Sequence, residues 1–151
     1  MASNRTIVLV GNSGGSHHEE GILDTIASPG MHVQMAADGH WDPSPAAVGE
    51  LVKSGVWIVK EDRLQGKGVA DAYAVGDVAF LYMPLKGDRL NLLVKSGENI
   101  AVGDIIETEG GGTGLFVEAA GTEASYKAKA VESTGGALAA NGLVACVWLG
   151  L

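Results

Sequence analysis

Short apolar runs separated by glycine-containing turns dominate the hydrophobic pattern of the chain. Runs rich in β-branched or large apolar residues are typical of strands and occur at 6–10, 56–59, 90–94 and 115–117. At 31–35 and 124–131, apolar and polar residues alternate with the period of two expected of a strand with one buried face. We therefore expect Met31, Val33 and Met35 to point inward.

The last apolar run, residues 143–149, has apolar side chains on both faces. This pattern predicts a central strand, or a strand with one face in the core and the other in a subunit contact. The sole cysteine, Cys146, lies within this run. We therefore expect a buried, inert thiol and no disulfide framework.

A turn followed by a strand recurs along the chain. Residues 74–80 read Ala-Val-Gly-Asp-Val-Ala-Phe, residues 101–106 read Ala-Val-Gly-Asp-Ile-Ile, and residues 28–33 form a looser third copy. In each copy a glycine can supply the positive φ of a tight turn, and β-forming residues follow it. This spacing predicts a mostly β chain with one or two short helices, folded as a single antiparallel domain that resembles a barrel or sandwich.

One short helix is expected at 45–54, because Ser44 and Pro45 suit a helix start and Gly55 suits its end. The polar, glycine-flanked residues 60–68 predict a loop or a single helical turn.

Residues 11–20, Gly-Asn-Ser-Gly-Gly-Ser-His-His-Glu-Glu, combine small and charged types and predict a long exposed loop. The chain is therefore expected to divide into an N-terminal strand or arm with a flexible loop, 1–19, and a β-rich domain, 20–151.

Composition narrows the possible functions. The 151 residues suit one globular domain, with 46% hydrophobic and 19% charged residues. Ten Lys and Arg against 18 Asp and Glu give a net charge of −8, which repels a phosphate backbone, so we expect no nucleic-acid partner. The apolar runs are far shorter than the roughly 20 residues of a membrane span, and the start of the chain lacks the layout of a secretion signal. We expect no membrane partner and synthesis in the cytoplasm.

A possible nucleophile appears at Ser13, because residues 11–15 match the Gly-x-Ser-x-Gly pattern and follow a predicted strand. However, a trypsin-like order requires a histidine before the serine, and no histidine precedes Ser13. The chain also lacks the crossover helices of a hydrolase fold. The sequence favours a plain flexible loop and predicts no enzyme. A small hydrolase that uses Ser13 remains an alternative.

No cofactor or metal site is expected. His17, His18, Glu19 and Glu20 carry metal-ligand groups, but adjacent side chains on a strand point to opposite faces, so a solvated polar loop is favoured. His32 and His40 lack ligand spacing, and no glycine cluster continues into a phosphate-binding Lys-Ser/Thr pair.

The three tryptophans are the largest apolar groups. Trp57 and Trp148 lie in β-rich runs, which predicts core packing. Anchoring of an interface is the alternative for each of them and for Trp41.

Residues 61–77, Glu-Asp-Arg-Leu-Gln-Gly-Lys-Gly-Val-Ala-Asp-Ala-Tyr-Ala-Val-Gly-Asp, resemble a signature segment of the tailed-phage capsid decoration (cement) proteins. The later order is also similar: an apolar strand, residues 96–104 with Ser-Gly-Glu-Asn-Ile-Ala-Val-Gly-Asp, a glycine tip, residues 128–133 and an apolar last strand. The resemblance spans roughly residues 20–149. The segments 11–18 and 41–45 depart from the commoner family pattern.

The resemblance implies a β-rich, non-enzymatic virion protein, usually a trimer. Such proteins bind the outside of an icosahedral head near its local three-fold axes and stiffen the shell after expansion. The implied partners are the major capsid protein of a tailed phage and further copies of the chain itself.

The candidate capsid or subunit interface follows from these expectations. The strand at 6–10 could add to a sheet of the shell protein or of a neighbouring subunit, because an unpaired strand edge accepts another strand. The residues that we assign to the interface are Thr6, Ile7, Val8, Leu9, Val10, Trp41 and Trp148.

Other binding modules remain as alternatives. A carbohydrate-binding or host-attachment β-domain would use an exposed Trp41 and polar loops, but aromatic residues make up only 5% of the chain. The turn-strand repeat also suits a barrel-like carrier domain, but no lysine stands in a convincing modification motif at a hairpin tip.

Overall fold

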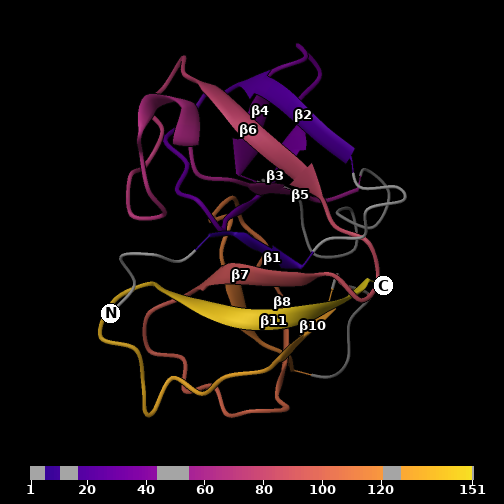
Figure 1. Ribbon diagram of the computed structural model, residues 1–151, viewed down its shortest axis with the longest axis vertical. Helices are drawn as coiled ribbons and strands as arrows, with labels where there is room; N and C mark the ends of the chain where they lie inside the picture. Colours follow the sequence, from indigo (N-terminus) through magenta and orange to yellow (C-terminus); the bar gives the residue numbers. More distant parts are fainter. Residues whose placement is uncertain (1–5, 11–16, 44–54, 121–126, 151) are drawn as a thin grey trace.

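Two β-sheets, one above the other in Figure 1, form the part of the chain that the computed structural model describes, residues 6–10, 17–43, 55–120 and 127–150. The upper sheet has the spatial order β2 (His17–Ile22), β6 (Val78–Met83), β5 (Trp57–Val59), β3 (His32–Met35) and β4 (Trp41–Pro43). The other sheet has the order β1 (Val8–Val10), β7 (Arg89–Val94), β11 (Gly142–Gly150), β10 (Lys127–Ala130), β8 (Ile105–Thr108) and β9 (Phe116–Glu118).

The second sheet closes into a barrel, because β9 also pairs with β7. This pairing is parallel and joins Val94 to Phe116, whereas the other pairings between named strands are antiparallel. Strands β7, β11, β10, β8 and β9 therefore form a five-stranded ring, with β1 added outside on β7. The predicted single, mostly β, barrel-like domain is confirmed.

Helical structure in the described residues is limited to the 3₁₀ turn η1 (Arg63–Gln65), inside the segment predicted to be a loop or one helical turn. The helix predicted at 45–54 lies outside the described residues. No described helix has the length and apolar character needed to cross a bilayer.

The barrel core follows the period-two alternation of its strands. β11 buries Val144, Cys146 and Trp148, and it lies between β7 and β10, so the predicted central strand is confirmed. Burial raises the pKa of the Cys146 thiol to about 12, as expected of an inert cysteine.

The upper sheet contributes to two hydrophobic clusters. Ile58 and Tyr82 belong to the same buried cluster as the barrel interior, whereas their neighbours Val59 and Leu81 belong to the second cluster. Successive side chains of a strand point to opposite faces, so the sheet is covered on both sides. The two sheets therefore share a core and form one folded unit.

The repeated turns have a common hydrogen-bonding scheme. Gly76 and Gly103 adopt φ of 83° and 96°, and the backbone N–H of the following aspartate donates to the carbonyl three residues earlier. The aspartate side chain in turn accepts from Ala74 N or Ala101 N, at 2.8 Å in both turns. The Gly-Asp pair therefore fixes the turn that precedes β6 and β8.

Two local predictions were wrong. Met35 is 56% exposed instead of inward, because it ends β3 beside the turn at 36–40, whereas His32 is fully buried. Residues 17–20 form part of β2 instead of a loop, since their backbone pairs with the apolar strand β6. Residues 11–16 lie outside the described residues. The division of the chain at residue 19 stays a prediction, although that position lies inside β2.

Buried His32 predicts a pH dependence of stability. Its Nε2 donates to the Leu115 carbonyl at 2.8 Å, and its ring packs edge-on against Phe116. Burial lowers the pKa of His32 from 6.5 to about 4, although the Leu115 carbonyl and Glu109 act in the opposite direction. The unfolded chain therefore binds the proton first, and stability is lost as the pH falls from about 6.5 to about 4.

We expect His32 to contribute about 3 kcal/mol to that loss, since one pKa unit corresponds to about 1.4 kcal/mol. Urea denaturation of the wild type and of His32→Gln between pH 7 and pH 4 measures this contribution. The variant should show the shallower pH dependence, and parallel curves would contradict the assignment.

Candidate interaction site

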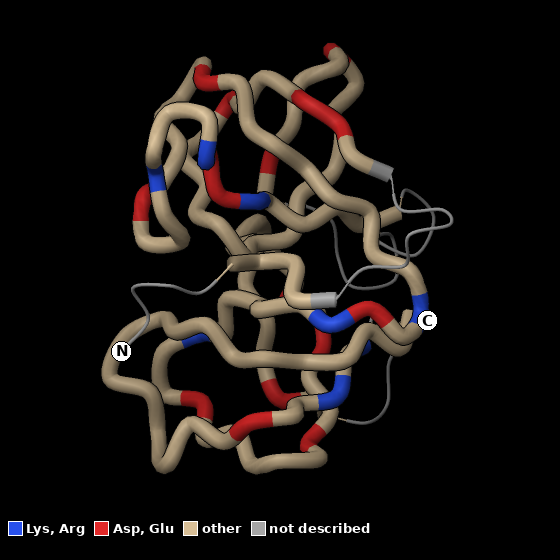
Figure 2. The backbone as a smooth tube through the Cα atoms, viewed as in Figure 1, with Lys and Arg blue, Asp and Glu red and all other residues tan. Residues whose placement is uncertain are grey.

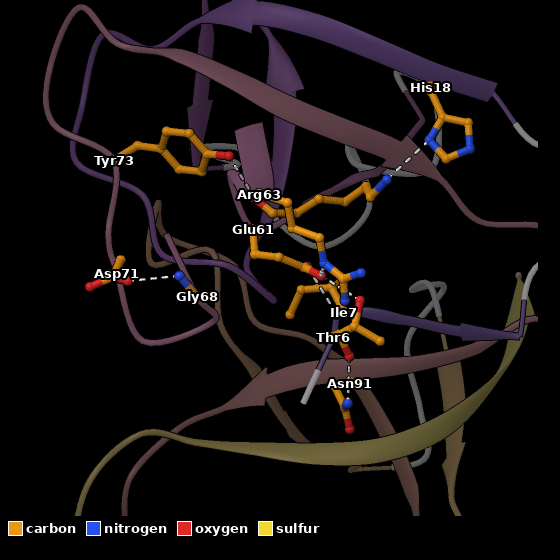
Figure 3. A network of polar contacts seen from close by, with 10 residues as sticks. Thr6, Ile7, His18, Glu61, Arg63, Gly68, Asp71, Tyr73 and Asn91 are labelled. Carbon is orange, nitrogen blue, oxygen red and sulfur yellow. Dashed lines mark hydrogen bonds and ion pairs between the residues drawn. The ribbon is translucent and has the colours of Figure 1, made fainter. Parts of the chain in front are cut away.

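A buried carboxylate holds the N-terminal segment against the upper sheet (Figure 3). Glu61 is only 6% exposed and accepts hydrogen bonds from the Thr6 hydroxyl, from the backbone N–H of Ile7 at 3.1 Å and from Arg63 Nε at 2.9 Å. Burial works to raise the pKa of Glu61, but the hydrogen bonds from Thr6 and Ile7 and the Arg63 charge hold the pKa below its usual value. Glu61 therefore stays ionised and paired.

The N-terminal segment also binds the barrel. Asn91 of β7 donates from Nδ2 to the Thr6 carbonyl at 2.6 Å, and its backbone N–H donates to the Ile7 carbonyl at 2.8 Å. The Ile7 side chain is fully buried in the barrel cluster. Residues 6 and 7 thus connect the two sheets.

Local sequence explains the shape of the segment after Glu61. Asp62 caps η1, because its carboxylate accepts from Gln65 N at 3.1 Å, and Gly66 ends the turn in the left-handed conformation. This tight turn holds Arg63 and Leu64 outward, with 85% of Leu64 exposed. The turn therefore presents an exposed apolar side chain beside a guanidinium.

An open groove of about 470 Å³ lies beside this turn. Its apolar walls are Val8, Leu64 and Phe80. Its polar lining consists of Thr6, His18, Lys60, Glu61 and Arg63. The groove can therefore contact an apolar side chain and a charged group at the same time.

The groove concentrates positive charge in an acidic protein. Figure 2 shows acidic positions over both sheets with fewer basic positions among them. Lys60 Nζ lies 3.3 Å from His18 Nδ1. Burial is the main cause that lowers the pKa of His18, and the Lys60 charge is the second. Burial also lowers the pKa of Lys60, where the Glu61 charge opposes the shift and the Arg63 charge adds to it.

We expect Glu61→Gln to destabilise the protein by about 1–3 kcal/mol, because the ionised acceptor of three donors is lost in a buried position. Urea denaturation and hydrogen exchange of the Ile7 amide measure the effect. Glu20→Gln on exposed β2 is the matched control and should change stability by less than about 0.5 kcal/mol. Equal stabilities of the two variants would contradict the proposed role of Glu61.

The structure separates the predicted interface residues into two groups. Thr6 and Val8 line the groove, and Leu9 is 42% exposed. Val10 pairs with Arg89 in the β1–β7 ladder. The other members, Ile7, Trp41 and Trp148, are at most 4% exposed and leave little side-chain area for a partner.

The tryptophans pack inside the protein. The rings of Trp41 and Trp57 meet edge-on at 5.6 Å, and Trp148 meets Phe116 at 6.3 Å. Trp148 is in the core, as predicted, and Trp57 is partly buried against the second cluster. Buried Trp41 is not the exposed platform that the carbohydrate-binding alternative needs.

The structure brings together a set of metal-ligand groups that sequence spacing did not reveal. Asp24, Asp38 and His40 place one ligand atom each within 4.8 Å of one another. His40 Nδ1 lies 2.7 Å from an Asp24 oxygen, and this contact raises the pKa of His40. In the described structure the imidazole is thus held by its own carboxylate neighbours.

Ser13 lies outside the described residues.

Sequence reasoning missed the groove residues Lys60, Arg63 and Leu64. Residues 60–63 form a polar run, and the separation of 54 positions between Ile7 and Glu61 in the sequence hides their contact. The one local signal was Leu64, an isolated leucine among charged and polar neighbours in a predicted turn.

The sequence matches no protein-family model and no curated protein. The fold is similar to a solved structure described as the head fiber gp8.5 N base in bacteriophage phi29, with a TM-score of 0.53. The two sequences are 16% identical, and the match covers 91% of this chain and 98% of the other. The chain shares its β fold with a phage head component over nearly its whole length.

Proposed function

We propose that the chain is a non-enzymatic structural protein of a tailed-phage head, which binds the outside of the icosahedral shell as an oligomer and stabilises it. The observation that carries this proposal is the fold shared with the phi29 head fiber base over 91% of the chain. The resemblance of residues 61–77 to decoration proteins supports the same class of function. The proposed partners are the major capsid protein and two further copies of the chain.

The physical properties of the surface suit this role. The closed barrel is a rigid body, and the net charge of −8 keeps an outward face soluble. In the part of the chain that the structure describes, the large apolar side chains that are at least 38% exposed are Leu9, Ile22, Ile26, Met35, Leu64, Val75, Val78, Val102 and Val131. Burial of such side chains supplies the driving force of protein association.

Strand β1 is the proposed point of addition for a partner strand. It pairs with β7 of its own chain on one side and ends the order of its sheet. An edge strand can accept a further strand through its backbone groups. Because deletion of residues 1–10 would also remove buried Ile7, Leu9→Asp is the cleaner variant, and we expect weaker shell binding with unchanged folding.

Co-sedimentation tests the proposed function. Purified protein is mixed with expanded, undecorated capsids built from the shell protein of the same genome, and unexpanded capsids serve as the control. We expect saturable, stoichiometric binding to expanded capsids, improved heat resistance of the shell and a trimer in solution. A monomer that does not bind expanded capsids would overturn the proposal.

A further inference from the structure

The groove beside η1 has two chemically different walls in one small space. Val8, Leu64 and Phe80 are apolar, whereas His18, Lys60 and Arg63 carry or can accept positive charge. The walls come from β1, β2, β6 and the segment that follows β5, so distant parts of the sequence hold them in place.

Among the described residues that line the groove, Lys60 and Arg63 outnumber the one carboxylate, that of Glu61. The carboxylate of Glu61 already accepts hydrogen bonds from the Thr6 hydroxyl, the Ile7 amide and Arg63 Nε. Lys60 Nζ lies 3.3 Å from His18 Nδ1. Burial, followed by the Lys60 charge, lowers the pKa of His18. Burial also lowers the pKa of Lys60, although the Glu61 charge acts in the opposite direction and the Arg63 charge adds to the shift. An additional carboxylate in the groove would accept charge-assisted hydrogen bonds from Lys60 or Arg63 and add negative charge beside them.

Leu64 provides the apolar contact. Its side chain is 85% exposed although the turn that carries it is fixed at both ends, by the Asp62 cap and by left-handed Gly66. The backbone of Leu64 therefore loses little conformational freedom when a partner covers the side chain.

We propose that this groove binds a short acidic segment of a partner protein, in which an apolar side chain stands beside a carboxylate. Charge complementarity with Lys60 and Arg63 selects the carboxylate, and Leu64 with Phe80 selects the apolar neighbour. The net charge of −8 disfavours a long polyanion. The identification of the partner as the shell protein rests on the proposed function.

An NMR titration tests the groove by itself. The probe is a blocked peptide, Gly-Glu-Leu-Asp-Gly, and the controls are the same peptide with glycine in place of leucine and inorganic phosphate. We expect saturable shifts at the amides of Arg63, Leu64 and Phe80 with the first peptide, and binding at least about tenfold weaker in Leu64→Ser and in Arg63→Gln, the loss of about one such contact. Equal shifts with the leucine-free peptide or phosphate, or no shifts, would overturn the proposal.

Capsid binding separates this inference from the proposed function. Leu64→Ser and Arg63→Gln are compared with Val102→Ser and Lys129→Gln, which also replace an apolar residue by serine and a basic residue by glutamine, at exposed positions outside the groove. The groove variants should bind expanded capsids about tenfold more weakly, and the control variants should bind as the wild type does. If all four bind like the wild type, the groove proposal is wrong and the proposed function stands. If the wild type does not bind capsids, the proposed function fails and the peptide titration decides the groove.

Discussion

Replacement of Trp148 by alanine is expected to cost about 3–5 kcal/mol of folding free energy, the usual cost of truncating a buried aromatic side chain. Trp148 is 2% exposed, lies on the central strand β11 and packs edge-on against Phe116 of β9. The variant would leave a cavity inside a closed ring of strands, which cannot collapse easily. Since domains of this size are stable by about 5–15 kcal/mol, the loss removes a large share of the folding free energy and should clearly lower the urea concentration at the unfolding midpoint.

Urea denaturation of the isolated chain measures this loss, and Val102→Ala, at a 66% exposed position, is the control with little expected change. The experiment also distinguishes the two roles considered for Trp148. A variant that keeps wild-type stability and loses only partner binding would show that Trp148 serves an interface instead of the core.

Gly30→Ala is expected to destabilise the protein by about 2–5 kcal/mol, for two additive reasons. Gly30 has a φ of +92°, and a left-handed conformation costs an L-residue about 1–2 kcal/mol. A methyl group at this position would also lie 2.7 Å from Leu143 Cδ2 and 2.9 Å from Leu93 N, and such overpacking adds about 1–3 kcal/mol. Gly30 N donates to Val59 O, and Gly30 O accepts from Leu93 N, so the clash falls where the upper sheet meets the barrel.

Gly39→Ala is the matched control. Gly39 has a similar φ of +86°, but among the described residues no heavy atom beyond its chain neighbours lies within 4 Å of the position of its added methyl group. Its cost should be limited to the backbone contribution of about 1–2 kcal/mol. Thermal and urea denaturation of both variants gives the difference, and equal losses would contradict the close approach at Gly30.

The strands and turns were predictable because their causes are local. The apolar run 143–149 and the Gly-Asp turns at 76–77 and 103–104 specify backbone conformations within a few residues. Met35 was misplaced because a period of two gives the face of a side chain but not how far the covering layer extends. Residues 17–20 were misplaced because pairing with β6, not their own composition, makes them a strand.

The candidate site was not predictable, since it depends on contacts between distant segments. Glu61 reads as one acid in a polar run, and its role appears only when β1 places Thr6 and Ile7 beside it. Trp41 and Trp148 are assigned to the interface because they are large, but large aromatic side chains are common both in protein cores and in interfaces. Burial distinguishes these two places, and it is a property of the folded chain.

Association with a phage shell is the central claim of this account, and cryo-electron microscopy of expanded capsids mixed with the protein tests it most directly. The account predicts additional, symmetric density on the outer surface, into which the barrel and the upper sheet fit, with three copies around each local three-fold axis. Capsids that show no added density at saturating protein, or density only on their inner surface, would contradict it.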